Sequence, residues 1–286
     1  MRHRICIGII MLWGYALWAA AQNVSYTKAD STLIVNLLNT QEKGNKGTLF
    51  FARKLLGRPY VAHTLEVNDN EQLVVNTRQL DCTTLVETVT ALTLCTKEGK
   101  NTFQDYTNML TKLRYRQGQL TDYASRLHYF SDWINDKQKM GLVEEIQLPN
   151  PPFTAIQKLN INYMSKHPKA YKALVSRPEL IGQIKQQEAQ LTGRTYRYIP
   201  KSQIKNSQLL RKTVKDGDII AITCSKEGLD IAHLGFAVWH KDGLHLLNAS
   251  MIHKKVVEEP MTLGEYLSKH PSHTGIRIIR ITNIKN

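Results

Sequence analysis

Cys82, His233 and Asn248 are the residues whose types and order in the chain could carry out nucleophilic catalysis. A thiol nucleophile needs a histidine base, and that base needs a third polar group to orient it. His233 lies 151 positions after Cys82 (233 − 82), and Asn248 lies 15 positions after His233 (248 − 233). Some thiol hydrolases carry their histidine and asparagine about 130–150 residues beyond the cysteine. The pattern therefore predicts attack of a cysteine thiolate on a carbonyl carbon.

Cys82 lies at the predicted start of a helix. Asp81 is a good N-cap, and Thr84 with Glu87 offers a competing capping box one turn later. The unpaired N–H groups and the positive end of the helix dipole are expected to favour the thiolate of Cys82. The alternative is that Cys82 is a small buried hydrophobic residue. An apolar face at helical spacing follows, formed by Leu85, Val89 and Leu92.

The last third of the chain predicts antiparallel strands at 219–223, 233–239, 245–250 and 275–281. The D-G turn at 241–243 makes a hairpin of the second and third strands. Adjacent antiparallel strands can bring His233 beside Asn248. The alternatives are a hydrogen-bonded strand-end histidine and an ordinary turn asparagine. Helical patterns dominate the earlier part of the chain, at about 27–57 and 102–193, with an extended segment at 60–65 and a short strand at 73–75. Helices followed by a meander predict an α+β fold.

Residues 1–21 have the features of a secretory signal peptide: a basic head, a short apolar middle and an A-x-A site. We expect export to the periplasm or the extracellular space, with no stable membrane insertion after cleavage. Residues 22–286 then form a single domain, because no linker divides them. The formal charge of the whole chain is +14, but it lacks nucleic-acid-binding motifs. The mature chain would hold three cysteines (Cys82, Cys95 and Cys224), so at least one thiol is free, and pairing of the other two stays open.

Five short motifs together resemble the NlpC/p60 clan of bacterial cell-wall cysteine hydrolases. They follow the order of the clan and are GRPYV at 57–61, DCT at 81–83, KDGDII at 215–220, HLGFAV at 233–238 and LNAS at 247–250. Two features depart from the minimal pattern. Asn248 stands where the clan more often has histidine, and the segment between Cys82 and His233 is much longer. The long segment and the DCTTLVE sequence resemble a branch associated with N-acetylmuramoyl-L-alanine amidase activity, first catalogued as a domain of unknown function.

The resemblance implies a papain-like α+β core with a helical insertion at about 101–200. It implies that Cys82 is the nucleophile, His233 the general base and acid, Asn248 the residue that orients His233, and Tyr60 a donor to the oxyanion. Further substrate contacts are expected from Asp81, Thr83, His63 and Arg78.

The implied reaction is hydrolysis of an amide bond in peptidoglycan or muropeptides, with no cofactor and no metal, by a monomer. The bond is muramoyl–L-alanine or, alternatively, D-glutamyl–diamino acid in the stem peptide. Two other classes stay open. One is a non-catalytic cell-wall binding protein. The other is a zinc amidase, since four histidines gather in the last third, although they follow no familiar ligand spacing: His233, His240, His245 and His253.

Overall fold

The computed structural model describes residues 24–40 and 47–282 of the chain, so the predicted signal peptide lies outside the described residues. The fold is α+β, as the sequence predicts, with helices packed on a largely antiparallel sheet. The sheet has eight strands in the order β4-β5-β10-β6-β7-β8-β9, with β3 also paired to β10. These strands are β3 (Val143–Ile146), β4 (Ala155–Lys158), β5 (Thr195–Pro200), β6 (Ile219–Cys224), β7 (Ile231–Trp239), β8 (Leu244–Ser250), β9 (Lys255–Glu258) and β10 (His273–Ile281).

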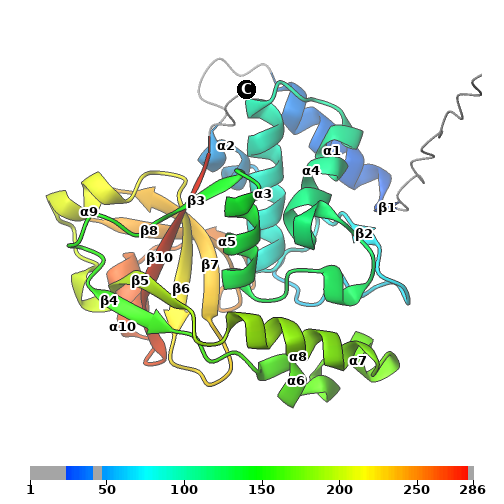
Figure 1. Cartoon of the computed structure of the whole chain (residues 1–286). Coiled ribbons are helices and arrows are strands. Elements are labelled where there is room, and N and C mark those ends of the chain that lie inside the picture. Colours follow the sequence, from blue (N-terminus) through cyan, green and yellow to red (C-terminus); the bar gives the residue numbers. More distant parts are fainter. Residues whose placement is uncertain (1–23, 41–46, 283–286) are drawn as a thin grey trace, which may run out of the picture.

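The main helices stand on one side of the sheet, with α3 next to the strands (Figure 1). A small parallel pair, β1 (Val24–Ser25) and β2 (Leu73–Val74), lies apart from the main sheet. The helices are α1 (Lys28–Asn39), α2 (Thr48–Arg53), α3 (Cys82–Lys97), α4 (Phe103–Arg114), α5 (Phe130–Lys139), α6 (Tyr163–Lys166), α7 (Lys172–Ser176), α8 (Leu180–Leu191), α9 (Gln208–Thr213) and α10 (Leu263–Ser268). Among the described residues, none of these helices has the length and apolar character needed to cross a bilayer.

The predicted meander is confirmed. Strand β6 pairs with β7, β7 with β8, and β10 with β6, all antiparallel. The prediction missed β9, which pairs with β8 and extends the sheet. It was also wrong to make residues 102–193 almost wholly helical, because β3 and β4 lie in this segment and β5 follows directly. Strands β3 and β5 join the main sheet through β10, so the inserted segment is built into the core sheet.

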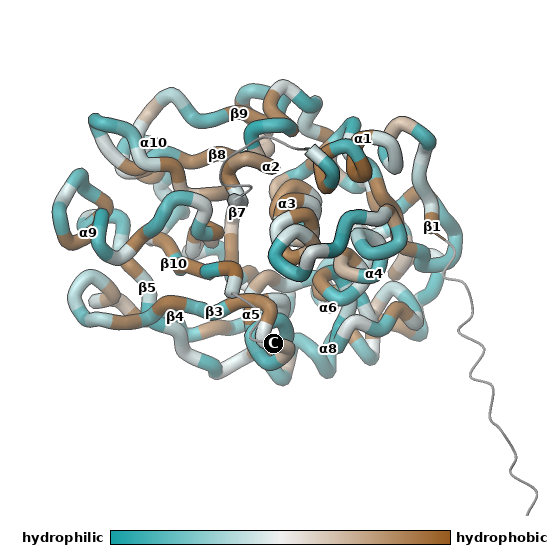
Figure 2. The backbone as a smooth tube through the Cα atoms, turned by 90° about the horizontal axis from the view of Figure 1, so that it is seen from above, coloured by the Kyte–Doolittle hydropathy of each residue, from teal (hydrophilic) through white to brown (hydrophobic). Residues whose placement is uncertain are grey.

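Helix α3 is the centre of the fold. The sequence predicts one apolar face, but every residue from Thr84 to Cys95 is buried, on all sides of the helix. It packs against β7 and β8 on one side and against α1, α2 and α4 on the others. The buried hydroxyl of Thr93 bonds within the helix, to Val89 O at 2.8 Å, whereas that of Thr90 has no hydrogen-bond partner among the described residues. Figure 2 shows α3 as a largely hydrophobic coil inside the molecule.

The segment after Tyr60 differs from the expected extended run. Tyr60 itself forms a bridge with Leu80, but residues 62–65 are a turn, and His63 takes a left-handed conformation with φ of 62°. The bridge matters for the site, because Leu80 lies two residues before Cys82. It fixes the motif at 57–61 beside the start of α3.

Candidate active site

Asp81 caps α3 and places Cys82 at its first position, as predicted. Its Oδ1 accepts the backbone N–H of Thr84 at 2.8 Å, and the Thr84 hydroxyl accepts the N–H of Asp81 at 2.9 Å. This reciprocal capping box uses Thr84 as the partner of Asp81. The alternative start with Thr84 and Glu87 is therefore wrong. Cys82 is half-buried and faces a cavity.

The thiol of Cys82 is surrounded by hydrogen-bond donors. The backbone N–H groups of Leu234 and Thr83 and the Thr83 hydroxyl lie close enough to act on the pKa of the thiol. These donors favour the thiolate, but burial and the charge of Asp81 outweigh them and raise the pKa of Cys82 to about 12. The expectation that the helix terminus favours a resting thiolate is thus wrong, since burial is the larger effect. This direction of the pKa shift favours a neutral thiol, which would need a base when it attacks.

His233 on β7 is held by Asn248 on β8. Its Nε2 lies 3.0 Å from Oδ1 of Asn248, and the amide nitrogen of Asn248 donates to Leu246 O at 3.4 Å. With the amide in this orientation, Oδ1 is an acceptor, so Nε2 carries the proton and Nδ1 keeps the lone pair. Burial is the main cause that lowers the pKa of His233. A neutral imidazole with a free Nδ1 is the form that can take a proton from a thiol.

The hairpin geometry explains why these two residues meet. Phe236 on β7 pairs with Leu247 on β8. Moving from this pair away from the turn of the hairpin, β7 leads to His233 and β8 leads to Asn248, so both residues lie toward the same end. Gly235 follows His233 by two residues on β7 and lies against Leu247 of β8. A Cβ at Gly235 would come within 2.6 Å of Leu247 O, so any side chain there would push β7 away from β8. The glycine of the HLG motif therefore keeps the two strands close enough for the His233–Asn248 hydrogen bond.

Two tyrosines lie within electrostatic range of the thiol. Burial raises the pKa of Tyr60, and the charges of Cys82 and Asp81 add to the effect. Burial also raises the pKa of Tyr266 to about 12, with smaller contributions from Glu259 and Cys82. The Tyr266 ring lies 6.4 Å from the imidazole of His233 between centroids, with the planes 30° apart.

Tyr266 was missed by sequence reasoning. It lies on α10, whose start carries a capping box formed by Thr262 and Glu265. That S/T-x-x-E signal could have located the helix, although not its position beside the thiol.

A cavity of about 170 Å³ joins Cys82 and His233. The segment between these two residues supplies one wall. Its aromatic and apolar side chains come from three separate elements and share no motif, so the sequence carried no signal for them. The wall residues are His128, Tyr129, Phe130, Met164 and Tyr171. Asp230 also lines the cavity, and its Oδ2 accepts the N–H of Ser131 at 2.6 Å, which fixes the start of α5.

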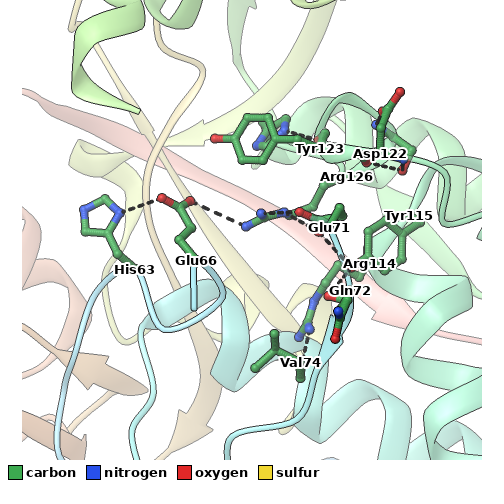
Figure 3. A network of polar contacts seen from close by, with 12 residues as sticks. His63, Glu66, Glu71, Gln72, Val74, Arg114, Tyr115, Asp122, Tyr123 and Arg126 are labelled. Carbon is green, nitrogen blue, oxygen red and sulfur yellow. Dashed lines mark hydrogen bonds and ion pairs between the residues drawn. The ribbon is translucent and has the colours of Figure 1, made fainter. Parts of the chain in front are cut away.

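A buried polar network holds the loop that precedes Cys82 (Figure 3). Arg114 on α4 donates to Glu87 of α3 at 2.7 Å and to Val74 O at 2.6 Å. Arg126 makes two hydrogen bonds with Glu71, at 2.8 and 3.0 Å. The network thus ties the loop and α3 to the inserted segment.

Two predicted contact residues lie apart from the thiol. His63 is exposed and faces Glu66 at 3.9 Å, at the edge of the network in Figure 3. Arg78 pairs with Asp30 at 3.5 Å. His63 and Arg78 therefore do not line the cavity that Cys82 faces. Thr83, another of the predicted contact residues, does line it. The four histidines of the zinc alternative do not form one cluster, since His233 bonds to Asn248 and His253 to Glu259, away from the pair of His240 and His245.

The three cysteines of the described residues are all free. Cys95 and Cys224 are buried, and they do not pair. Burial raises the pKa of both thiols. Cys82 is therefore the cysteine among them that reaches a cavity shared with a histidine.

Comparison with known proteins gives consistent matches. The model of the AmiA-like family, described as N-acetylmuramoyl-L-alanine amidase-like, matches residues 50–276. A crystal structure of an N-acetylmuramoyl-L-alanine amidase from Bacteroides uniformis is 40% identical, with a TM-score of 0.78, covering 83% of this chain and 100% of that one. A structure from Bacteroides fragilis, named as a candidate xylanase, is 39% identical, with a TM-score of 0.76, covering 82% and 100%.

A more distant structure shares the fold. A protein from Legionella pneumophila is 23% identical, with a TM-score of 0.69, covering 88% of this chain and 94% of that one. No curated protein matches the sequence.

Proposed function

The chain belongs to the N-acetylmuramoyl-L-alanine amidase-like family and is an amidase-like hydrolase, and on that premise we propose that it is a cysteine amidase acting on muropeptides. The bond cleaved joins the lactyl carbonyl of the muramoyl sugar to the amine of L-alanine. The fold is of the papain-like NlpC/p60 kind, and residues 22–286 act as one catalytic domain.

One arrangement carries the proposal. Cys82 and His233 line the same cavity, and His233 is fixed through Nε2 by Asn248 at 3.0 Å. The nitrogen that remains for the thiol is Nδ1. A nucleophile, a neutral base and an orienting group thus share one cavity, which supports thiol chemistry.

Acylation follows from these groups. Nδ1 of His233 takes the proton of Cys82 as the sulfur attacks the carbonyl carbon. The carbonyl oxygen becomes an oxyanion, for which the Tyr60 hydroxyl and a backbone N–H of Cys82 or Thr83 are the donors, worth roughly 3 kcal/mol each when well placed. The imidazolium then gives its proton to the departing amine of L-alanine, the C–N bond breaks and a thioester remains.

Deacylation reuses the same base. His233 takes a proton from water, the hydroxide oxygen attacks the thioester carbonyl, and the C–S bond breaks. Cys82 recovers the proton from the imidazolium, and the muramoyl carboxylic acid leaves. Asn248 keeps the ring in place through both half-reactions.

The cavity favours small, partly apolar fragments over a polymer strand. Its walls of Tyr129, Met164 and Tyr171 enclose about 170 Å³ beside the thiol. A glycosidase would need two carboxylates on either side of the scissile bond. Among the described residues that line the cavity, Asp230 is the single acidic side chain, and it is bonded to Ser131. The lining thus supports an amidase over a xylanase.

The test is mass spectrometry of a disaccharide tetrapeptide incubated with protein in H₂¹⁸O. We expect free disaccharide with one ¹⁸O in the lactyl carboxylate and a peptide that begins with L-alanine. A disaccharide dipeptide would instead make the protein a D-glutamyl endopeptidase. No cleavage, together with saturable binding, would make it a cell-wall binding protein. Cys82→Ala is the control, and turnover by this variant would overturn the thiol mechanism.

We also propose that the protein works as an exported monomer in the periplasm or outside the cell, where such fragments arise. The apolar stretch within residues 1–21 supports export. N-terminal sequencing of the protein from the source cells tests this, and we expect the mature chain to begin at Gln22.

A further inference from the structure

Three metal-ligating side chains meet at the turn of the β7–β8 hairpin. They are His240, Asp242 and His245, and one ligand atom of each lies within 4.8 Å of the other two. The turn is closed by the N–H of His240, which donates to Gly243 O at 2.9 Å. The same hairpin carries His233 and Asn248 nearer its other end, so this cluster is separate from the candidate active site.

Both ring nitrogens of His245 face hydrogen-bond acceptors. Its Nδ1 lies 2.9 Å from the backbone oxygen of Glu259, which can only accept, so Nδ1 carries a proton. In the neutral ring Nε2 then has a lone pair. This nitrogen lies 3.1 Å from Oδ1 of Asp242, which is also an acceptor. Two acceptors at this distance need either a second proton or a cation to bind both of them.

One ring nitrogen of His240 is likewise held by an acceptor, which leaves the other nitrogen with a lone pair. Its Nε2 lies 2.6 Å from Oε1 of Glu258, so this nitrogen donates and Nδ1 carries the lone pair. Glu258 is held in turn by Arg53 at 3.2 Å. Metal-bound histidines commonly donate their second nitrogen to a carboxylate or a backbone carbonyl, and His240 and His245 show one case of each. The two rings lie 4.4 Å apart between centroids.

We propose that His240, Asp242 and His245 bind a divalent cation of the Zn²⁺ class. Two imidazole nitrogens and one carboxylate oxygen suit this class, and water would complete a tetrahedral site. Bond lengths near 2.0–2.2 Å at tetrahedral angles put neighbouring ligand atoms about 3.3 Å apart. The 3.1 Å between His245 and Asp242 is already close to that separation. The side chain of His240 is 42% exposed, so a cation can reach it from solvent.

The bound cation would be structural. It would join the ends of β7 and β8 at their turn and, through Glu258, link them to β9 and α2. His233 is not among its ligands, so the cation takes no part in the thiol reaction. The inference is therefore independent of the proposed amidase activity.

The experiment is calorimetric titration of the full chain with Zn²⁺ in a Cys82→Ala background, which removes the thiol as a competing ligand. We expect one Zn²⁺ per chain. His240→Ala and Asp242→Asn, both at exposed positions, should each weaken binding by more than about tenfold. His167→Ala removes an exposed histidine outside the cluster and should leave the binding unchanged. Circular dichroism of each variant checks that it is folded.

A second measurement identifies the nitrogen atoms. Imidazole ¹⁵N shifts should show Nε2 of His245 metal-bound after Zn²⁺ is added, and a chelator should reverse the change. The protein should also unfold at a higher temperature with Zn²⁺ than with chelator. Absence of saturable one-to-one binding, equal binding by both variants, or a His245 ring that keeps two protons in the presence of Zn²⁺ would each overturn the proposal.

Discussion

Asn248 accepts the Nε2–H of His233 at 3.0 Å while its own amide nitrogen faces Leu246 O, so the group that orients the base is neutral and fixed. A neutral partner selects the tautomer with a free Nδ1 but cannot balance the charge of an imidazolium. In the proposed mechanism Asn248 therefore holds the ring, and proton transfer depends on His233.

This division of roles predicts unequal losses. His233→Ala should lower kcat/KM by roughly 10²–10⁴, because the general base is gone. Asn248→Ala should cost less, because the base stays in the cavity with a looser orientation. Steady-state kinetics on a disaccharide tetrapeptide measure both, with unfolding temperatures as the control for folding. A larger loss for Asn248→Ala would mean that the orienting residue is misassigned.

The resting thiol should be neutral. Burial and Asp81 raise the pKa of Cys82 to about 12, and burial lowers the pKa of His233 below its usual 6.5. At neutral pH both groups are then uncharged, so the protein should show no ultraviolet thiolate absorbance that Cys82→Ser removes. A thiolate signal at neutral pH, lost in Cys82→Ser, would instead indicate a preformed thiolate–imidazolium pair.

The same shifts set the acidic limit of activity. His233 must be neutral to accept the thiol proton, and its lowered pKa keeps it neutral further into the acidic range. The acidic limb of kcat/KM should therefore fall below pH 6.5. Asn248→Asp places a carboxylate against the ring, which favours imidazolium, so the limb should move to higher pH. If the acidic limb stayed at the same pH in Asn248→Asp, the limb would report the ionisation of a group other than His233.

Tyr60 should act on the transition state. Tyr60→Phe keeps the ring but removes the donor, so kcat should fall by roughly 10²–10³ with little change in KM. Tyr266→Phe is the matched control, because this second tyrosine also lies near Cys82 and His233. If Tyr266→Phe lost more activity than Tyr60→Phe, the oxyanion donor would be the tyrosine of α10.

The sequence predicts what depends on local pattern. The Asp81 cap, the start of α3 at Cys82 and the strands that carry His233 and Asn248 follow from capping and alternation, and the structure has all of them. The packing around them does not follow. The burial that raises the pKa of Cys82 comes from elements far apart in the chain. The same is true of the cavity wall, where Tyr129, Met164 and Tyr171 are placed by tertiary contacts and no local signal marks them.

The inserted segment shows why periodicity was misleading. Strands β3 and β4 have four residues each, too few to display alternation, and they form because β10 and β5 offer backbone partners. Likewise α3 reads as amphipathic, since its threonines look like a polar face, yet they are buried. Both errors concern segments whose environment is set by distant parts of the chain.

The ion pair of Arg114 and Glu87 should hold the catalytic helix in place. Both side chains are 3% exposed, and Arg114 also bonds to Val74 O in the loop before Cys82. Arg114→Met leaves the Glu87 carboxylate buried without its partner, so the free energy of unfolding should fall by about 3–5 kcal/mol in urea titrations. Adding Glu87→Leu removes the unpaired charge and should recover much of the lost stability. The hydrogen bond from Arg114 to Val74 O stays lost in the double variant.

The control is an exposed ion pair. Lys166→Met breaks the pair with Glu227, where the side chains are 54% and 78% exposed, and should change the free energy of unfolding by less than about 1 kcal/mol. Equal losses for Arg114→Met and Lys166→Met would mean that the buried pair does not anchor α3 to α4. An additive double variant would mean that the two charges are not coupled.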